Sequence, residues 1–143
     1  MEYSFHSSLP ISLKNELEKL FFFNEEQSVV YPKIEIALEK YGNPRIIEKN
    51  GKINIVLEKL EECQNLILTG TFGNSNLVLG IILHSRVTNT RAELIHFAVD
   101  KTIKDNANEV FNILLKEITR IYKMIKGIED IYITYLGKKI KII

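Results

Sequence analysis

The stretch Ala92-Glu93-Leu94-Ile95-His96-Phe97-Ala98-Val99-Asp100 decides most about the fold of this 143-residue sequence. It is mainly apolar, it follows the turn-forming Thr88-Asn89-Thr90, and it precedes the clearest helical pattern in the chain. In that pattern apolar residues recur at helical spacing from position 107 to 125, Asn106 can cap the first turn, and Gly127 ends the helix. The sequence therefore predicts a long strand followed directly by a long amphipathic helix.

Apolar residues alternate with a period of two upstream of this stretch, which is typical of strands. Asn50-Gly51 lies between two such runs and is the strongest short signal for a hairpin. We predict an antiparallel meander here and one more strand after the long helix. The predicted strands are residues 45–49, 52–57, 65–71, 77–86, 91–99 and 130–135.

The first 44 residues predict a short strand at 3–5 and two helices. Ser12 starts the first helix, and the second, residues 32–41, ends before Gly42. Phe21-Phe22-Phe23 is apolar on all sides, so we expect this end of the first helix to lie under another element. Together these segments predict the α+β class and a single domain spanning residues 1–143.

Composition and charge exclude several classes of protein. Hydrophobic residues make up 45% and charged residues 26%, as in ordinary globular proteins, and the net charge is +1. A nucleic-acid or anionic-membrane binder needs a basic excess, so we expect neither partner. No apolar run reaches the roughly 20 residues of a membrane span, and residues 1–6 lack a secretory pattern, so we expect a cytoplasmic protein.

The order strand, turn, long strand, turn, strand, helix, strand over residues 65–135 resembles the core of the GNAT acyltransferase superfamily. The strand at 92–99 has the family's form, small-acidic-aliphatic and then aliphatic-Ala-Val, and the preceding strand carries Gly80 about where the family often has a glycine. The resemblance implies a mixed, mostly antiparallel sheet with helices on both faces. It also implies acetyl-CoA-dependent N-acetyl transfer to an amine acceptor, a small molecule or a protein.

The same resemblance implies where acetyl-CoA binds. The strand at 91–99 would run parallel to the one at 130–135, joined by the long helix, and the two would diverge near residues 97–99. The pantetheine arm would pair with the diverging strand and the pyrophosphate would sit at the start of the helix. The implied cofactor-binding residues are Phe97, Ala98, Val99, Lys104, Asn106, Ala107 and Asn108. The loop at 104–109 departs from the family's basic, Gly-rich form, because it has no glycine.

Two residues are implied as catalytic. Glu93 falls where some members carry a carboxylate general base for the amine. Tyr132 lies on the strand that flanks the acyl pocket in the family, where a tyrosine can donate a proton to the leaving thiolate. Each has an alternative interpretation: Glu93 as a strand-end partner of Arg91 or Arg86, and Tyr132 as a packed aromatic with a solvated hydroxyl.

The histidines and the cysteine suggest no further site. Strand alternation predicts that His96 and Glu93 point to opposite faces. The spacing of His84, His96 and Glu93 matches no metal-ligand motif, so we expect no metal. Cys63 cannot form an internal disulfide, and the carboxylates before it would raise the pKa of its thiol, which makes it a poor nucleophile.

A non-catalytic module is the alternative class: a GNAT-like scaffold, or another α+β fold, that serves binding or interaction. Phe21-Phe22-Phe23, if exposed, would mark a partner surface. Pairing through an edge strand would give a homodimer. Lys138, Lys139 and Lys141 form a small basic cluster that suits a solvated edge.

Overall fold

The computed structural model describes residues 2–22, 37–100, 107–134 and 137–142. Within them lie a six-stranded sheet of order β1-β5-β6-β7-β8-β9 and a three-stranded sheet of order β2-β4-β3. All neighbouring strands are antiparallel except β7 and β8. The strands are β1 (Glu2–His6), β2 (Leu9–Pro10), β3 (Pro44–Lys49), β4 (Lys52–Leu57), β5 (Gln64–Phe72), β6 (Ser75–Arg86), β7 (Arg91–Val99), β8 (Asp130–Ile133) and β9 (Lys138–Lys141).

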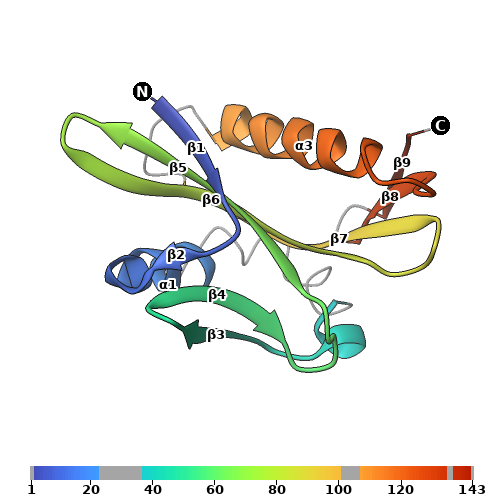
Figure 1. Ribbon diagram of the computed structural model, residues 1–143, viewed down its shortest axis with the longest axis horizontal. Coiled ribbons are helices and arrows are strands. Elements are labelled where there is room, and N and C mark those ends of the chain that lie inside the picture. Colours follow the sequence, from blue (N-terminus) through green and yellow to red (C-terminus); the bar gives the residue numbers. More distant parts are fainter. Residues whose placement is uncertain (1, 23–36, 101–106, 135–136, 143) are drawn as a thin grey trace.

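Helices cover both faces of the six-stranded sheet (Figure 1). The 3₁₀ turn η1 (Ile11–Leu13) leads into α1 (Lys14–Phe21) on one face, together with the small sheet and a helical segment at 37–41. The long helix α3 (Ala107–Lys123) lies on the other face. The α+β class and the mixed, mostly antiparallel sheet with helices on both faces are therefore confirmed.

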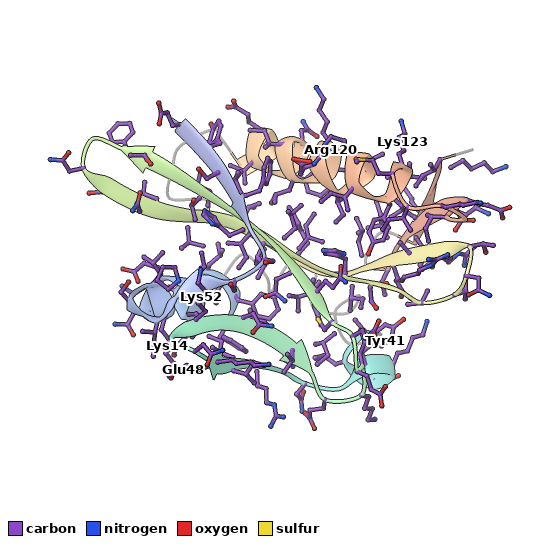
Figure 2. All side chains as sticks on the ribbon, viewed as in Figure 1. Lys14, Tyr41, Glu48, Lys52, Arg120 and Lys123 are labelled. Carbon is purple, nitrogen blue, oxygen red and sulfur yellow. The ribbon has the colours of Figure 1, made fainter. Side chains whose placement is uncertain are left out.

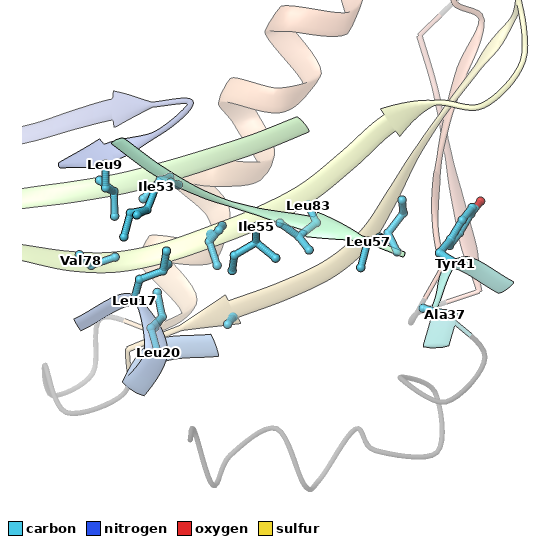
Figure 3. Close-up of a cluster of buried hydrophobic side chains, with 14 residues drawn as sticks. Leu9, Leu17, Leu20, Ala37, Tyr41, Ile53, Ile55, Leu57, Val78 and Leu83 are labelled. Carbon is cyan, nitrogen blue, oxygen red and sulfur yellow. The ribbon is translucent and has the colours of Figure 1, made fainter. Parts of the chain in front are cut away.

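Two separate hydrophobic clusters form the core. On the α1 face, Leu17 and Leu20 pack with buried residues of both sheets, as Figure 3 shows. On the α3 face, Leu114, Ile118 and Tyr122 pack against buried residues of β5 to β8. A sheet buried on both faces explains why β6 and β7 read as nearly continuous apolar runs.

The Asn50-Gly51 hairpin is present as predicted. Both residues have positive φ, 55° and 77°, the combination that a two-residue turn between right-twisted strands requires. The predicted meander is only partly right, since β4 pairs with β3 and β2 in a separate small sheet and only β5, β6 and β7 continue one another. The buried side chain of Asn65 on β5 joins the sheets: its amide bonds the backbone N and O of Ile55 on β4, both at 2.8 Å.

The parallel pair holds the long helix against the sheet. Arg91 to Leu94 of β7 pair with Asp130 to Ile133 of β8, and α3 connects the two strands. No helix in the described part of the chain combines the length and apolar character that crossing a membrane requires.

Candidate active site around Glu93

Glu93 is a buried carboxylate with three polar partners. It is 2% exposed. Tyr41 Oη donates to Oε2, Thr134 Oγ1 donates to Oε1, and Lys40 Nζ lies 3.5 Å from Oε2. Burying a carboxylate is costly unless it is hydrogen-bonded, and here both carboxylate oxygens accept hydrogen bonds from these donors.

The three partners come from two distant segments. Lys40 and Tyr41 end the helical segment at 37–41, which stops at Gly42, whose φ of 81° suits glycine. Thr134 follows β8, and its backbone N donates to Leu94 O at 3.1 Å. Glu93 thus joins the end of a helix to the end of the parallel strand pair.

Tyr41 remains a donor at all ordinary pH values. Burial and, secondly, the hydrogen bond to Glu93 raise the pKa of its hydroxyl well above the usual range, because both disfavour the phenolate. The arginines that the sequence offered as partners bond elsewhere: Arg91 Nε donates to Asp130 at 2.8 Å, and Arg86 donates to backbone carbonyls.

The cofactor-binding residues predicted on β7 have packed side chains. The Phe97 ring meets Phe111 of α3 edge-on at 4.5 Å between centroids. Ala98 is buried in the α1-side cluster and Val99 in the α3-side cluster. All three side chains therefore take part in packing.

The other predicted cofactor-binding residues lie wholly or partly outside the described residues. Lys104 and Asn106 lie outside the described residues. Ala107 and Asn108 open α3, and their side chains are likewise outside the description.

Tyr132 lies beside Glu93. The two residues pair in the parallel register. Because the flanking residues Ile131 and Ile133 belong to the α3-side cluster, Tyr132 projects to the α1 side, as Glu93 does. Its half-buried ring packs under the Arg91 guanidinium, whose Cζ is 5.5 Å from the ring centroid.

His96 lies on the same face as Glu93, so the prediction from strand alternation is wrong. Leu83 pairs with His96 but the next residue, His84, pairs with Leu94, so Ile95 is an extra residue in β7. Such a bulge reverses the alternation beyond it. The His96 ring accordingly meets Phe21 of α1 edge-on at 5.8 Å.

The two buried histidines do not gather with Glu93. His84 faces α3, where its Nδ1 and Tyr122 Oη are 2.7 Å apart. Burial lowers the pKa of each histidine to about 4. No group of three His, Cys, Asp or Glu among the described residues is arranged to hold a metal. Burial also raises the pKa of the Cys63 thiol to about 12, which makes it a poor nucleophile, as predicted.

A groove along α3, hereafter the α3 groove, was not predicted from the sequence. It has a volume of about 710 Å³. Apolar side chains from β1, α3 and β9 line it together with three cations, two of which, Arg120 and Lys123, are labelled on the outer side of α3 in Figure 2. The apolar side chains are Phe5, Ile113, Leu115 and Ile140, and the third cation is Lys116.

The sequence also gave no sign of Lys40, Tyr41 and Thr134, because no local pattern connects them with Glu93. Comparison of the chain with protein-family models, with curated proteins and with solved structures gives no match. The chemistry of this protein must therefore be inferred from its own residues, foremost the carboxylate of Glu93 and the donors around it.

Proposed function

We propose that the protein is an acetyl-CoA-dependent N-acyltransferase in which Glu93 is the general base. The observation that carries the proposal is the placement of Glu93, a buried carboxylate beside the last paired residues of the parallel strands β7 and β8. A parallel pair joined by a long helix is what the resemblance to the GNAT superfamily implies. In that resemblance the acyl donor lies where the two strands part.

The strand register fits such a donor. Among the described residues, β8 pairs with β7 as far as Leu94, whereas β6 pairs with β7 as far as Val99. The bulge at Ile95 lies between these two limits, and bulges are frequent next to active sites. In the resemblance the pantetheine arm lies along residues 97–99 of this strand.

Each residue has a defined task in the reaction. The acceptor amine attacks the thioester carbonyl carbon, and Glu93 removes a proton from the amine nitrogen. The carbon–sulfur bond breaks, and Tyr132 donates a proton to the leaving thiolate. Tyr41 and Thr134 hold the Glu93 carboxylate in place throughout.

The test has two independent readouts. Binding is measured by thermal shift with millimolar acetyl-CoA or CoA; a ligand at 100 times its Kd stabilises the fold by about 2.7 kcal/mol. Transfer is measured as CoA thiol release with a panel of primary amines. Glu93→Gln should lower transfer by roughly 10²–10⁴-fold with CoA affinity nearly unchanged.

Glu48→Gln is the matched control. Glu48 is exposed on β3, at the end of the small sheet away from Tyr41 (Figure 2), and its replacement should leave transfer unchanged. No stabilisation by acetyl-CoA or CoA would rule out the enzyme. An active, folded Glu93→Gln variant would refute only the role of Glu93.

The α3 groove favours a second candidate, a non-catalytic binding module. Its lining is apolar with three cations, Lys116, Arg120 and Lys123, against one carboxylate, Glu117, which pairs with Arg120. This balance suits an acidic amphipathic helix of a partner protein. The Phe21-Phe22-Phe23 run fits a partner surface less well, because Phe21 packs on His96; Phe22 is 40% exposed, and Phe23 lies outside the described residues. An acidic amphipathic peptide that binds the wild type but not Arg120→Glu would support this candidate.

A further inference from the structure

Lys40 connects the buried carboxylate with solvent. Its side chain is 60% exposed, whereas that of Glu93 is 3% exposed, and 3.5 Å separates Lys40 Nζ from Glu93 Oε2. The same ammonium lies 5.1 Å from the centroid of the Tyr41 ring, a distance at which a cation is attracted to the ring. A primary amine thus already occupies the position that an acceptor must reach to give its proton to Glu93.

From this geometry we infer that Lys40 is an acyl acceptor, so that the protein acetylates its own Lys40 Nζ from acetyl-CoA. The inference rests on the proposed function and names one acceptor for it. Effective concentrations of groups held in reactive geometry are very high, so an amine fixed beside the general base competes well with free amines.

The step balances without any further reactant. The Lys40 ammonium loses a proton to Glu93, and the free amine attacks the thioester carbonyl carbon of acetyl-CoA. The nitrogen–carbon bond forms, the carbon–sulfur bond breaks, and the nitrogen loses a second proton. The products are Nε-acetyl-Lys40, CoA with its thiol protonated, and one proton released to solvent, with no change of oxidation state.

Other exposed lysines provide internal controls. Lys14 and Lys52 are exposed and lie on the opposite side of the molecule from Tyr41 (Figure 2). Spontaneous acetylation by acetyl-CoA should treat these lysines and Lys40 alike. Transfer assisted by Glu93 should single out Lys40.

The experiment follows acetylation of each lysine over time by peptide mass spectrometry after addition of acetyl-CoA. We expect Lys40 to react about 10²-fold faster than Lys14 and Lys52, the low end of what a general base contributes. The rate constant should not depend on protein concentration, because the transfer is intramolecular. In the Lys40→Arg variant, the intact mass of the protein should no longer show the fast addition of one acetyl group.

Glu93→Gln should lower the acetylation rate of Lys40 to that of Lys14 and Lys52. The acetylation rates of Lys14 and Lys52 should not change. Acetyl phosphate provides a readout on the wild-type chain, independent of whether that variant folds. It carries the same acyl group without CoA and so is not held at the proposed donor site, and the preference for Lys40 over Lys14 and Lys52 should be at least about 10-fold smaller than with acetyl-CoA. Equal enrichment of Lys40 with both donors would overturn the inference, because Lys40 would then simply be reactive.

Two further outcomes separate the inference from the proposed function. If acetyl-CoA stabilises the fold but Lys40 reacts no faster than Lys14 and Lys52, or if its rate constant rises with protein concentration, the inference is wrong and the proposed function stands. If neither acetyl-CoA nor CoA stabilises the fold, the proposed function itself is wrong.

Discussion

At the scale of single residues, the polar groups inside the core set the response to pH. His84 and His96 are both buried. The His84 ring has a partner in Tyr122, whereas His96 Nε2 has no hydrogen-bond partner within the described part of the chain. Both rings are neutral at pH 7, because burial lowers the pKa of each to about 4. Protonation of either ring therefore favours the unfolded chain.

We predict that the free energy of unfolding falls as the pH drops from about 6.5 to about 4. Between these values the unfolded chain binds protons that the folded chain excludes, so stability is fully present above pH 6.5 and is lost toward pH 4. Each histidine should contribute a loss of about 3 kcal/mol by pH 4. Urea unfolding at pH 7.5, 5.5 and 4.5 measures the effect.

His96→Leu is the diagnostic variant for this prediction. It replaces a ring whose Nε2 makes no bond to the described residues, so stability at pH 7.5 should change little, while the dependence on pH should shrink by about half. An unchanged dependence on pH in His96→Leu would show that other groups cause it.

At the scale of elements, the close packing of α3 against the sheet depends on Gly80 of β6. A Cβ at Gly80 would lie 2.7 Å from Leu114 Cδ1 and 3.0 Å from Val110 Cγ1, both in the α3-side cluster. Because Gly80 does not have a positive φ, the backbone conformation does not require a glycine here. The close packing of the helix requires it. The extra residue Leu79, a bulge in β6, turns Gly80 toward the helix.

Gly80→Ala should lower the free energy of unfolding by about 1–3 kcal/mol, the usual cost of overpacking a core. A double-mutant cycle with Leu114→Val assigns the cause. Leu114→Val makes room for the new methyl group. The double variant should therefore lose less free energy of unfolding than the sum of the losses in the two single variants. Additive effects in urea unfolding would contradict the contact with Leu114.

At the scale of the whole molecule, the two sheets are joined by packing and by Asn65. Its side chain is buried and bonds Ile55 as a neighbouring strand would. The side-chain oxygen accepts from Ile55 N, and the side-chain nitrogen donates to Ile55 O. This bond pair crosses from β5 to β4 and so fixes how the small sheet lies on the large one.

Asn65→Ala should therefore destabilise the fold by about 2–3 kcal/mol, because it leaves two buried backbone groups of Ile55 without their partner. Asn76→Ala is the matched control: Asn76 is exposed and its side chain bonds only Thr71 among the described residues, so its loss should cost less than about 0.5 kcal/mol. Thermal unfolding of both variants measures the difference, and equal melting temperatures would contradict the bridging role.

Local patterns in the sequence determined the elements. The bounds of β7, the Asn50-Gly51 hairpin and the long helix before the last parallel strand were all readable, because side-chain periodicity, turn residues and caps act over a few positions. The resemblance carried by residues 92–99 also anticipated the parallel pairing of β7 with β8.

Only the tertiary structure decided which side chains meet. One extra residue, Ile95, moved His96 onto the face of Glu93, and no periodicity announces a bulge whose position is set by pairing with β6. The split into two sheets and the joining of Glu93 to Tyr41 and Thr134 likewise depend on contacts between segments 41 or more residues apart. Such contacts form because packing and hydrogen-bond satisfaction are properties of the whole core, and a local stretch of sequence does not contain them.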